Sequence, residues 1–387
     1  MSFGFRILAE DTESDARAGV LETAHGEVHT PVFMPVGTQG TVKTCSPHEL
    51  IEVGSQIILG NTYHLYLRPG TDVIEAAGGL HKFSSWPGPI LTDSGGYQVY
   101  SLAQLRKVSD DGVVFQSHHD GSYHEFSPER SVDIQRSLGS DIMMVLDECP
   151  PYPCTEEYAV ESVDRTTRWA ARCRAHFLAT EPKYGAEQVL FGIVQGSTFH
   201  HLRERSAQAL VQMDFPGYAI GGLSIGEPKS VLFEIVAFTA ALLPRDKPRY
   251  LMGMGKPEDL LEAISLGVDM FDCVIPTRNA RKGQVFTRRG PINVKNAVYK
   301  EDFRPIEETC KCYACLNFTR AYLRHLIHAD EILGLRLTTL HNLFFYHQLV
   351  AEARQSIMEG RFVAWKEAFL AEYGMKQETL TAVHNLS

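Results

Sequence analysis

The 387-residue chain lacks the features that mark secreted, membrane or disordered proteins. It has only 8 cysteines, no apolar run long enough to cross a bilayer, and no internal repeat or low-complexity tract. The first twelve residues carry charges and no signal-peptide core. Positive charge is not in excess, because 47 acidic residues face 37 lysines and arginines. We therefore expect a soluble, cytoplasmic protein that does not grip nucleic acid over its whole surface.

Short apolar segments alternate with helical patterns along the first three quarters of the chain. Their hydrophobicity is continuous, which is typical of parallel strands covered on both faces. Eight alternations predict an α/β fold, with a (β/α)8 TIM barrel over residues 1–300. An open doubly wound sheet is the alternative, but the sequence has no G-x-G-x-x-G motif. The eight predicted strands are residues 32–36, 56–59, 90–92, 141–146, 189–194, 217–220, 249–252 and 270–273.

Two short antiparallel insertions are expected. Residues 113–126 predict a hairpin with Asp120-Gly121 at its turn, and residues 284–287 and 291–294 predict a second pair. Between them, Ser127 can cap a helix whose first turn begins with proline. Residues 301–387 are predicted to form an inserted zinc-binding subdomain and C-terminal helices packed on the barrel.

A cluster of ligating residues indicates a metal site. Cys310, Cys312 and Cys315 form a C-x-C-x2-C motif, and His341 follows in a helix predicted over residues 338–359 that ends before a glycine. Three thiolates and one imidazole fill the four positions of tetrahedral Zn2+, so we predict one structural zinc per subunit. The alternatives are free thiols in a loop, or a different histidine as the fourth ligand: His325, His328 or His347.

Carboxylates follow several predicted strands, at the end where a (β/α)8 barrel places its active site. They are Asp93, Asp147, Glu148 and Asp272. One carboxylate that attacks and another that moves protons can exchange groups at an acetal-like carbon. The alternative is that these side chains cap the helices that follow.

Glycines and two large side chains also lie at strand ends. The Gly221-Gly222 and Gly253-Met254-Gly255 runs allow backbone amides to approach a planar ligand. Tyr97 and Met252 are placed to sandwich a ring, although ordinary core packing is the alternative for both.

Residues 278–295 reverse the charge of the chain, with six basic side chains and no acidic one. They directly follow the strand that carries Asp272 and are placed to neutralise phosphates, unless they form a solvated loop. A glycosidic reaction beside a basic surface that can bind a polyanion predicts a nucleic-acid glycosylase or base exchanger. The six residues are Arg278, Arg281, Lys282, Arg288, Arg289 and Lys295.

Motifs along almost the whole chain resemble those of the bacterial tRNA-guanine transglycosylases, the queuine tRNA-ribosyltransferase family. This resemblance implies exchange of guanine at wobble position 34 of GUN-anticodon tRNAs for preQ1, by covalent double displacement, in queuosine biosynthesis. The motifs are FMPVG (33–37), LGNTYHL (59–65), TDSGGYQ (92–98), SPER (127–130), GGL (221–223), MFDC (270–273) and the C-x-C-x2-C with its histidine.

The resemblance also assigns roles. Asp272 would be the nucleophile and Asp93 the general acid/base. Cys149 and Ile225 would suit the small preQ1 better than queuine. The base would be bound by Asp147, Gln195, the backbone of Gly222 and Leu223, and the stacking residues Tyr97 and Met252.

The family further implies contacts with RNA and with a second subunit. We expect a homodimer formed through the zinc region, and no membrane association. A non-catalytic tRNA-binding subunit and a barrel glycosidase are rival interpretations, although the former would be expected to lose its carboxylates. The expected RNA contacts are Lys256, Arg278, Arg281 and Lys282.

Overall fold

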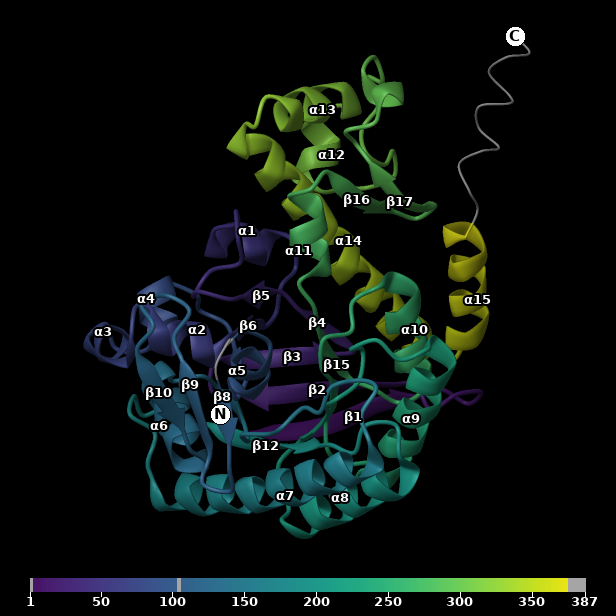
Figure 1. Cartoon of the computed structure of the whole chain (residues 1–387). Coiled ribbons are helices and arrows are strands. Elements are labelled where there is room, and N and C mark those ends of the chain that lie inside the picture. The colour runs from purple at the N-terminus through teal and green to yellow at the C-terminus, as the bar shows by residue number, and fades with distance from the viewer. Residues whose placement is uncertain (1–2, 103–105, 375–387) are drawn as a thin grey trace.

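A parallel sheet of nine short strand segments forms the centre of the molecule (Figure 1). The computed structural model describes residues 3–102 and 106–374. The segments are almost wholly buried, as expected for strands covered on both faces. In chain order they are β4 (Val32–Met34), β5 (Val36–Gly37), β6 (Ile58–Gly60), β7 (Ile90–Thr92), β11 (Ile142–Met144), β12 (Val189–Val194), β13 (Tyr218–Ile220), β14 (Arg249–Leu251) and β15 (Met270–Asp272).

The sheet closes on itself because its two edges belong to one stretch of chain. At one edge β4 pairs with β15, and at the other β5 pairs with β6. Only Pro35 separates β4 from β5. A proline has no N–H to donate, but the carbonyl of Pro35 still accepts a hydrogen bond from the amide of Leu59 at 3.0 Å. The nine segments therefore act as eight strands of a closed barrel, which confirms the predicted (β/α)8 fold.

Helices surround the barrel and connect its strands. Helix α6 begins as predicted, because the Ser127 hydroxyl accepts from the amide of Arg130 at 3.1 Å and Pro128 is the first helical residue. The buried amide of Gln135 then exchanges two 2.9 Å hydrogen bonds with the backbone of Met144 and fixes α6 on the sheet. The barrel helices are α1 (Pro47–Glu52), α2 (Thr62–Leu67), α3 (Thr71–Ala76), α4 (Leu80–Ser84), α5 (Gly96–Leu102), α6 (Pro128–Leu138), α7 (Glu156–Ala179), α8 (His200–Gln212), α9 (Lys229–Leu242), α10 (Pro257–Ser265) and α11 (Ile275–Ala280).

A three-stranded antiparallel sheet, which the sequence analysis did not predict, covers the N-terminal ends of the barrel strands. Its strands are β1 (Gly4–Glu10), β2 (Arg17–Thr23) and β3 (Gly26–Thr30). The buried guanidinium of Arg17 pairs with Asp269, just before β15, at 2.9 and 2.6 Å. We call this end of the barrel the floor and the opposite end, where the strands terminate, the mouth.

Both predicted antiparallel insertions are present. Strands β9 (Val113–Gln116) and β10 (Tyr123–Phe126) form the first hairpin, and β8 (Arg106–Val108) adds a third strand that was not predicted. The second pair consists of β16 (Gln284–Thr287) and β17 (Gly290–Asn293). Strand β17 begins one residue earlier than predicted, because Gly290 pairs with Thr287 across a two-residue turn.

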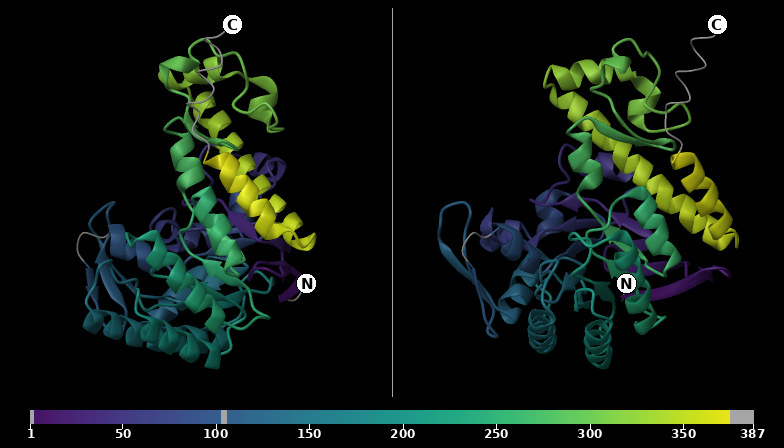
Figure 2. Two further views of the ribbon diagram at one scale, coloured as in Figure 1. Left: turned by 90° about the vertical axis from the view of Figure 1, so that its right-hand side faces the viewer. Right: turned by 45° about the vertical axis from the view of Figure 1, so that its right-hand side comes forward.

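The C-terminal part is a small helical subdomain joined to the barrel by one long helix. Figure 2 shows α14 running from this subdomain along the barrel, beside α15. Helix α14 starts six residues before the predicted Thr338. It packs closely on α13 there, and a Cβ on Gly334 would lie 2.9 Å from Leu326. The elements are η1 (Ala297–Tyr299), α12 (Tyr313–Asn317), α13 (Arg320–His328), α14 (Ile332–Met358) and α15 (Phe362–Tyr373).

A second hydrophobic core lies inside this subdomain and includes Val285 and Ile292 of β16 and β17. The predicted division of the chain at residue 300 stays a prediction, and its residues 375–387 lie outside the described structure. Within residues 3–102 and 106–374, no helix is long and apolar enough to span a membrane.

Candidate active site and metal centre

The mouth of the barrel holds the predicted carboxylates, because parallel strands deliver their C-terminal ends to one face. Asp93 directly follows β7 and Asp272 is the last residue of β15. The charge of Asp272 contributes to the raised pKa of Asp93, which places the two groups within electrostatic reach of each other. The structure therefore brings together the two residues predicted to perform the chemistry.

Asp93 is buried and held by three hydrogen bonds. Its Oδ2 accepts from the side-chain amides of Asn61 and Gln98 at 2.5 and 2.8 Å, and its Oδ1 accepts from the amide of Thr62 at 2.8 Å. Burial raises the pKa of Asp93 to about 6, although these bonds favour the ionised form. A carboxyl group that titrates near neutrality can both take up and release a proton under working conditions.

Asp272 is oriented through one of its two oxygens. Oδ1 accepts from the hydroxyl of Tyr250 at 2.5 Å and from the amide of Gly253 at 2.9 Å. Within the described residues Oδ2 has no hydrogen-bond partner, and the side chain keeps partial exposure at the mouth. Burial raises the pKa of Asp272, and both hydrogen bonds lower it. An oriented carboxylate with one free oxygen is suited to nucleophilic attack.

Asp147 and Gln195 form a second polar group beside this pair. Asp147 accepts from the Ser94 hydroxyl at 3.0 Å and from the Gln195 side-chain amide at 2.7 Å. Burial raises the pKa of Asp147 to about 6. The Gln195 carbonyl oxygen is buried and has no hydrogen-bond partner in the described part of the chain. A Cβ on Gly222 would lie 2.2 Å from this oxygen, so a larger residue there would displace the Gln195 side chain, and the φ of +66° of Gly222 also favours glycine.

Two functional candidates that the sequence analysis missed, Glu227 in the loop after β13 and Arg203 on α8, hold the backbone of this loop. The carboxylate of Glu227 accepts from the backbone amides of Ser224 and Ile225, the latter at 3.0 Å. The fully buried guanidinium of Arg203 donates to the carbonyls of Gly221 and Gly222 at 2.7 and 3.4 Å. The Gly221-Gly222 pair could have pointed to such residues. It predicts an irregular loop, and the backbone groups of a buried irregular loop need hydrogen-bond partners from side chains.

Tyr250 is a third residue that the sequence analysis missed. It lies in a predicted apolar strand, yet its hydroxyl donates a hydrogen bond to Asp272. The signal was present in principle, because a tyrosine in a core strand needs a partner for its hydroxyl.

Four further predicted residues were expected in the same region. Tyr97 on α5 is 49% exposed, so it is not a core residue. Cys149 is buried, and burial raises the pKa of its thiol to about 12. The pKa of Tyr97 is raised mainly by burial, and Cys149 adds to this rise. Met252, directly after β14, and Ile225 are partly buried. The predicted stacking of Tyr97 and Met252 on a ring stays a prediction.

The basic segment divides into paired and unpaired cations. Arg288 and Arg289 pair with Glu352 and Glu372, the second pair at 4.0 Å. Arg278 and Arg281 have no acidic partner among the described residues, and burial together with the charge of Arg278 lowers the pKa of Arg281. Lys256 and Lys282 are exposed and also unpaired in the described chain. The four residues expected to contact RNA are therefore cations without an acidic partner.

The three cysteines and His341 converge as predicted. Nδ1 of His341 lies 3.8, 3.5 and 3.3 Å from the sulfur atoms of Cys310, Cys312 and Cys315, and all four ligand atoms lie within 4.8 Å of one another. The second ring nitrogen of His341 lies 2.7 Å from the carbonyl of Phe286, which turns Nδ1 toward the sulfur atoms. This donor set fits a tetrahedral structural metal ion.

His341 thus belongs to the cluster, and the alternative ligands lie elsewhere. His347 is buried beside the Ser55 hydroxyl at 2.8 Å, and His328 lies 3.1 Å from the carbonyl of Lys295. The ring of His325 lies 6.4 Å from that of Tyr322 on α13, with the planes tilted by 31°.

Taken together, the structure is a (β/α)8 barrel with carboxylates gathered at its mouth and a separate subdomain that holds a Cys3His cluster. Residues 11–375 match the family model described as Queuine tRNA-ribosyltransferase. Proteins of that name in Pelotomaculum thermopropionicum and Desulforamulus reducens are 58% and 56% identical to this chain. Each alignment covers 96% of this chain and 99% or 98% of the relative. A Staphylococcus epidermidis relative is 55% identical over 95% of both chains.

The chain belongs to the queuine tRNA-ribosyltransferase family. It is accordingly an enzyme of the glycosyltransferase class.

Proposed function

We propose that the enzyme is a tRNA-guanine transglycosylase that exchanges guanine at position 34 of GUN-anticodon tRNAs for preQ1 in the cytoplasm, a step in queuosine biosynthesis. The observation that carries the proposal is the pair of mouth carboxylates within a chain of this family. Asp272 offers a free oxygen, and Asp93 titrates near neutrality. A non-catalytic subunit would need neither of these two carboxylates. A glycosidase that acts on a neutral sugar would need neither the unpaired cations nor the Cys3His cluster.

The reaction proceeds in two displacements. Oδ2 of Asp272 attacks C1′ of the ribose, a C–O bond forms as the bond to guanine breaks, and guanine leaves with the bonding electrons. PreQ1 then loses a proton and attacks C1′, which releases Asp272. Asp93 holds the proton exchanged with the bases. The ester conserves the energy of the broken bond and two inversions retain the configuration, so no ATP is required.

The base is held beside these carboxylates. Asp147, Gln195 and the backbone of Gly222 and Leu223 bind its edge, while Tyr97 and Met252 stack on its faces. The unpartnered Gln195 oxygen supports this role, because a donor on the base would satisfy it. The buried Cys149 and the partly buried Ile225 restrict the pocket to the small preQ1.

The RNA backbone lies against the unpaired cations. Arg278, Arg281 and Lys282 follow Asp272 within ten residues, and Lys256 follows β14. Cations without acidic partners are free to neutralise phosphates, which the paired Arg288 and Arg289 are not.

Zinc and dimer formation concern the small subdomain. We assign one Zn2+ to the Cys3His cluster, where it supplies structure and leaves no position for water. The homodimer forms through the exposed apolar surface of α1, α12 and the start of α14. This surface includes Ile51, Tyr313, Leu316 and Ile332, which are 52, 59, 63 and 72% exposed. Replacing Ile332 and Leu316 by glutamate should give monomers in sedimentation experiments.

Incorporation of labelled guanine into unmodified tRNA, without any nucleotide triphosphate, tests the function. The expected result is label at position 34 of GUN-anticodon transcripts only. A denaturant-resistant adduct between protein and transcript should appear as an intermediate. Failure to label any transcript, with metal bound and the protein folded, would refute the assignment.

A further inference from the structure

We propose that the floor of the barrel carries a second metal site, formed by His25, His81 and Asp141, which takes a divalent transition-metal ion such as Zn2+. His25 lies in the turn between β2 and β3, His81 lies on α4, and Asp141 directly precedes β11. Three segments far apart in sequence therefore meet at one carboxylate. Asp141 is at the opposite end of its strand from the mouth, so this site is separate from the proposed catalytic centre.

The distances show that all three side chains aim at one point. Nδ1 of His25 lies 2.7 Å from Oδ1 of Asp141, and Nε2 of His81 lies 3.2 Å from Oδ2. The three ligand atoms lie within 4.8 Å of one another. Two imidazoles and a carboxylate are the ligands of many zinc sites that keep a fourth position for water.

The two imidazole rings lie side by side at this carboxylate. They stack with their centroids 3.6 Å apart and their planes 18° apart, and both turn a nitrogen to the same carboxylate. Two nitrogens bound to one tetrahedral ion, each at about 2.0–2.1 Å, are separated by about 3.4 Å. Because ligand rings extend outward from the ion that they share, binding of one ion would turn the two stacked rings apart while their nitrogens stay beside Asp141.

The carboxylate is already oriented for this role. Its oxygens accept backbone hydrogen bonds from Ile90 at 2.8 Å and from His25 at 3.2 Å. Asp141 is almost fully buried, and the side chains of His25 and His81 keep 28 and 13% exposure. An ion can thus reach a site whose anionic ligand is fixed, a requirement for tight binding.

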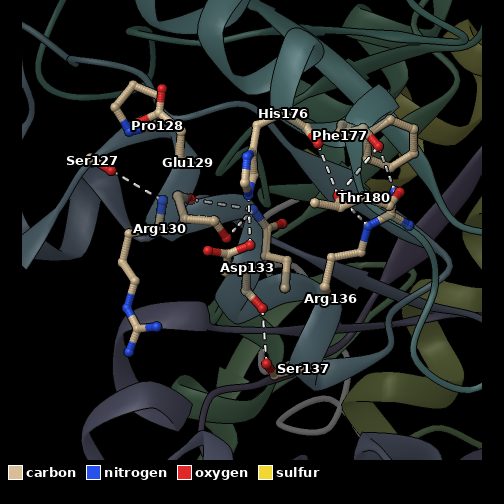
Figure 3. A network of polar contacts seen from close by, with 12 residues as sticks. Ser127, Pro128, Glu129, Arg130, Asp133, Arg136, Ser137, His176, Phe177 and Thr180 are labelled. Atoms are coloured by element: carbon tan, nitrogen blue, oxygen red, sulfur yellow. Dashed lines mark hydrogen bonds and ion pairs between the residues drawn. The ribbon is translucent and has the colours of Figure 1, made fainter.

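A second histidine–aspartate pair shows what the floor cluster adds. His176 and Asp133 also approach to 2.7 Å, on α7 and α6 (Figure 3). That pair has no third ligating side chain among the described residues, whereas the floor cluster and the Cys3His cluster each bring three or more together. His176 is therefore a matched control for a simple histidine–carboxylate contact.

The test counts metal ions in the full-length protein. Purified protein is incubated with ZnCl2 and dialysed, and zinc per chain is measured by mass spectrometry. The wild type and His176→Ala should retain a second equivalent beyond that of the Cys3His cluster. His81→Ala and His25→Gln should retain one equivalent less. Glutamine can still donate a hydrogen bond to Asp141 but is a poor zinc ligand, so this variant separates metal binding from hydrogen bonding.

A thermal measurement provides a second readout that does not require catalysis. Added Zn2+ should raise the unfolding midpoint of the wild type and of His176→Ala, because an ion that binds only the folded state stabilises it. When the Cys3His cluster is loaded beforehand, it should leave the midpoint of His25→Gln unchanged. Retention of one equivalent by the wild type, or of two by His25→Gln, would overturn the proposal. Because no step uses RNA or a base, these outcomes are independent of the proposed function.

Discussion

The mouth and the floor of the barrel both contain buried aspartates, but with opposite electrostatics. At the mouth, Asp93 and Asp147 have only neutral partners, and burial raises the pKa of each to about 6. At the floor, two histidines and a backbone amide outweigh burial and hold the pKa of Asp141 at about 2. Asp269, also at the floor, is buried against the guanidinium of Arg17.

The comparison distinguishes buried carboxylates that serve reactivity from buried carboxylates that stabilise the fold. A buried carboxylate without a cation costs folding free energy at neutral pH, and such a cost is typical of active sites. A buried carboxylate with a cation holds segments together and is costly only when one partner is removed. Mutations at the mouth should therefore change activity, and mutations at the floor should change stability.

The largest expected effect is the loss of activity in Asp272→Asn. An amide oxygen cannot form the ester, so base exchange should fall on the order of 10⁴-fold, and the denaturant-resistant adduct should disappear. The thermal midpoint should not fall below the wild-type value, and the zinc content should be unchanged. Base exchange is measured with labelled guanine, and substantial turnover in this variant would exclude Asp272 as the nucleophile.

At the floor, Arg17→Met should lower the free energy of unfolding by about 3–5 kcal/mol, because it leaves Asp269 buried without its cation. Denaturant titration measures this change. The control is Arg245→Gln, which breaks an exposed pair with Glu10 and should change the free energy of unfolding far less.

Base exchange by folded Arg17→Met should match the wild type. A large decrease in kcat at temperatures where this variant is folded would contradict the division between floor and mouth.

Asp93→Asn should remove the part of the pH dependence of stability that Asp93 contributes. The folded-state pKa of about 6 lies above the ordinary value of 3.8, so ionisation of Asp93 destabilises the fold as the pH rises through this window. Relative to the wild type, the variant should gain up to about 3 kcal/mol between pH 4 and pH 7. Denaturant titrations at several pH values measure the gain.

The same substitution should lower kcat by about 10²–10⁴-fold. Asp141→Asn at the floor is the opposite case. The folded-state pKa of Asp141, about 2, lies below the ordinary value of 3.8, so ionised Asp141 stabilises the fold above about pH 4, and the variant loses this contribution. If stability depends on pH equally in the wild type and in Asp93→Asn, burial does not raise the folded-state pKa of Asp93.

The barrel could be predicted from sequence because its information is local. Continuous apolar segments such as Val189–Val194 appear in the structure at the predicted positions. The C-x-C-x2-C spacing likewise identified its cluster. The strands of the missed N-terminal sheet pair locally, but the packing of this sheet on the barrel depends on distant partners, as when Arg17 reaches Asp269, 252 residues away.

The supporting residues of the site were missed for the same physical reason. Tyr250 and Arg203 look like ordinary residues of a strand and a helix, and their roles arise from contacts across the barrel. The roles of Asp93 and Asp272 came from the family resemblance and stay proposals.

The smallest expected effect concerns the cations beside the mouth. Changing Arg278 and Arg281 together to glutamine should weaken tRNA binding about tenfold. It should reduce the slope of log K against log salt by about 1.4–1.8, because two phosphate contacts are lost. Changing Arg288 and Arg289, which are engaged with Glu352 and Glu372, should reduce the slope less. Filter binding at several salt concentrations measures both, and equal reductions would mean that pairing with carboxylates does not decide which cations face RNA.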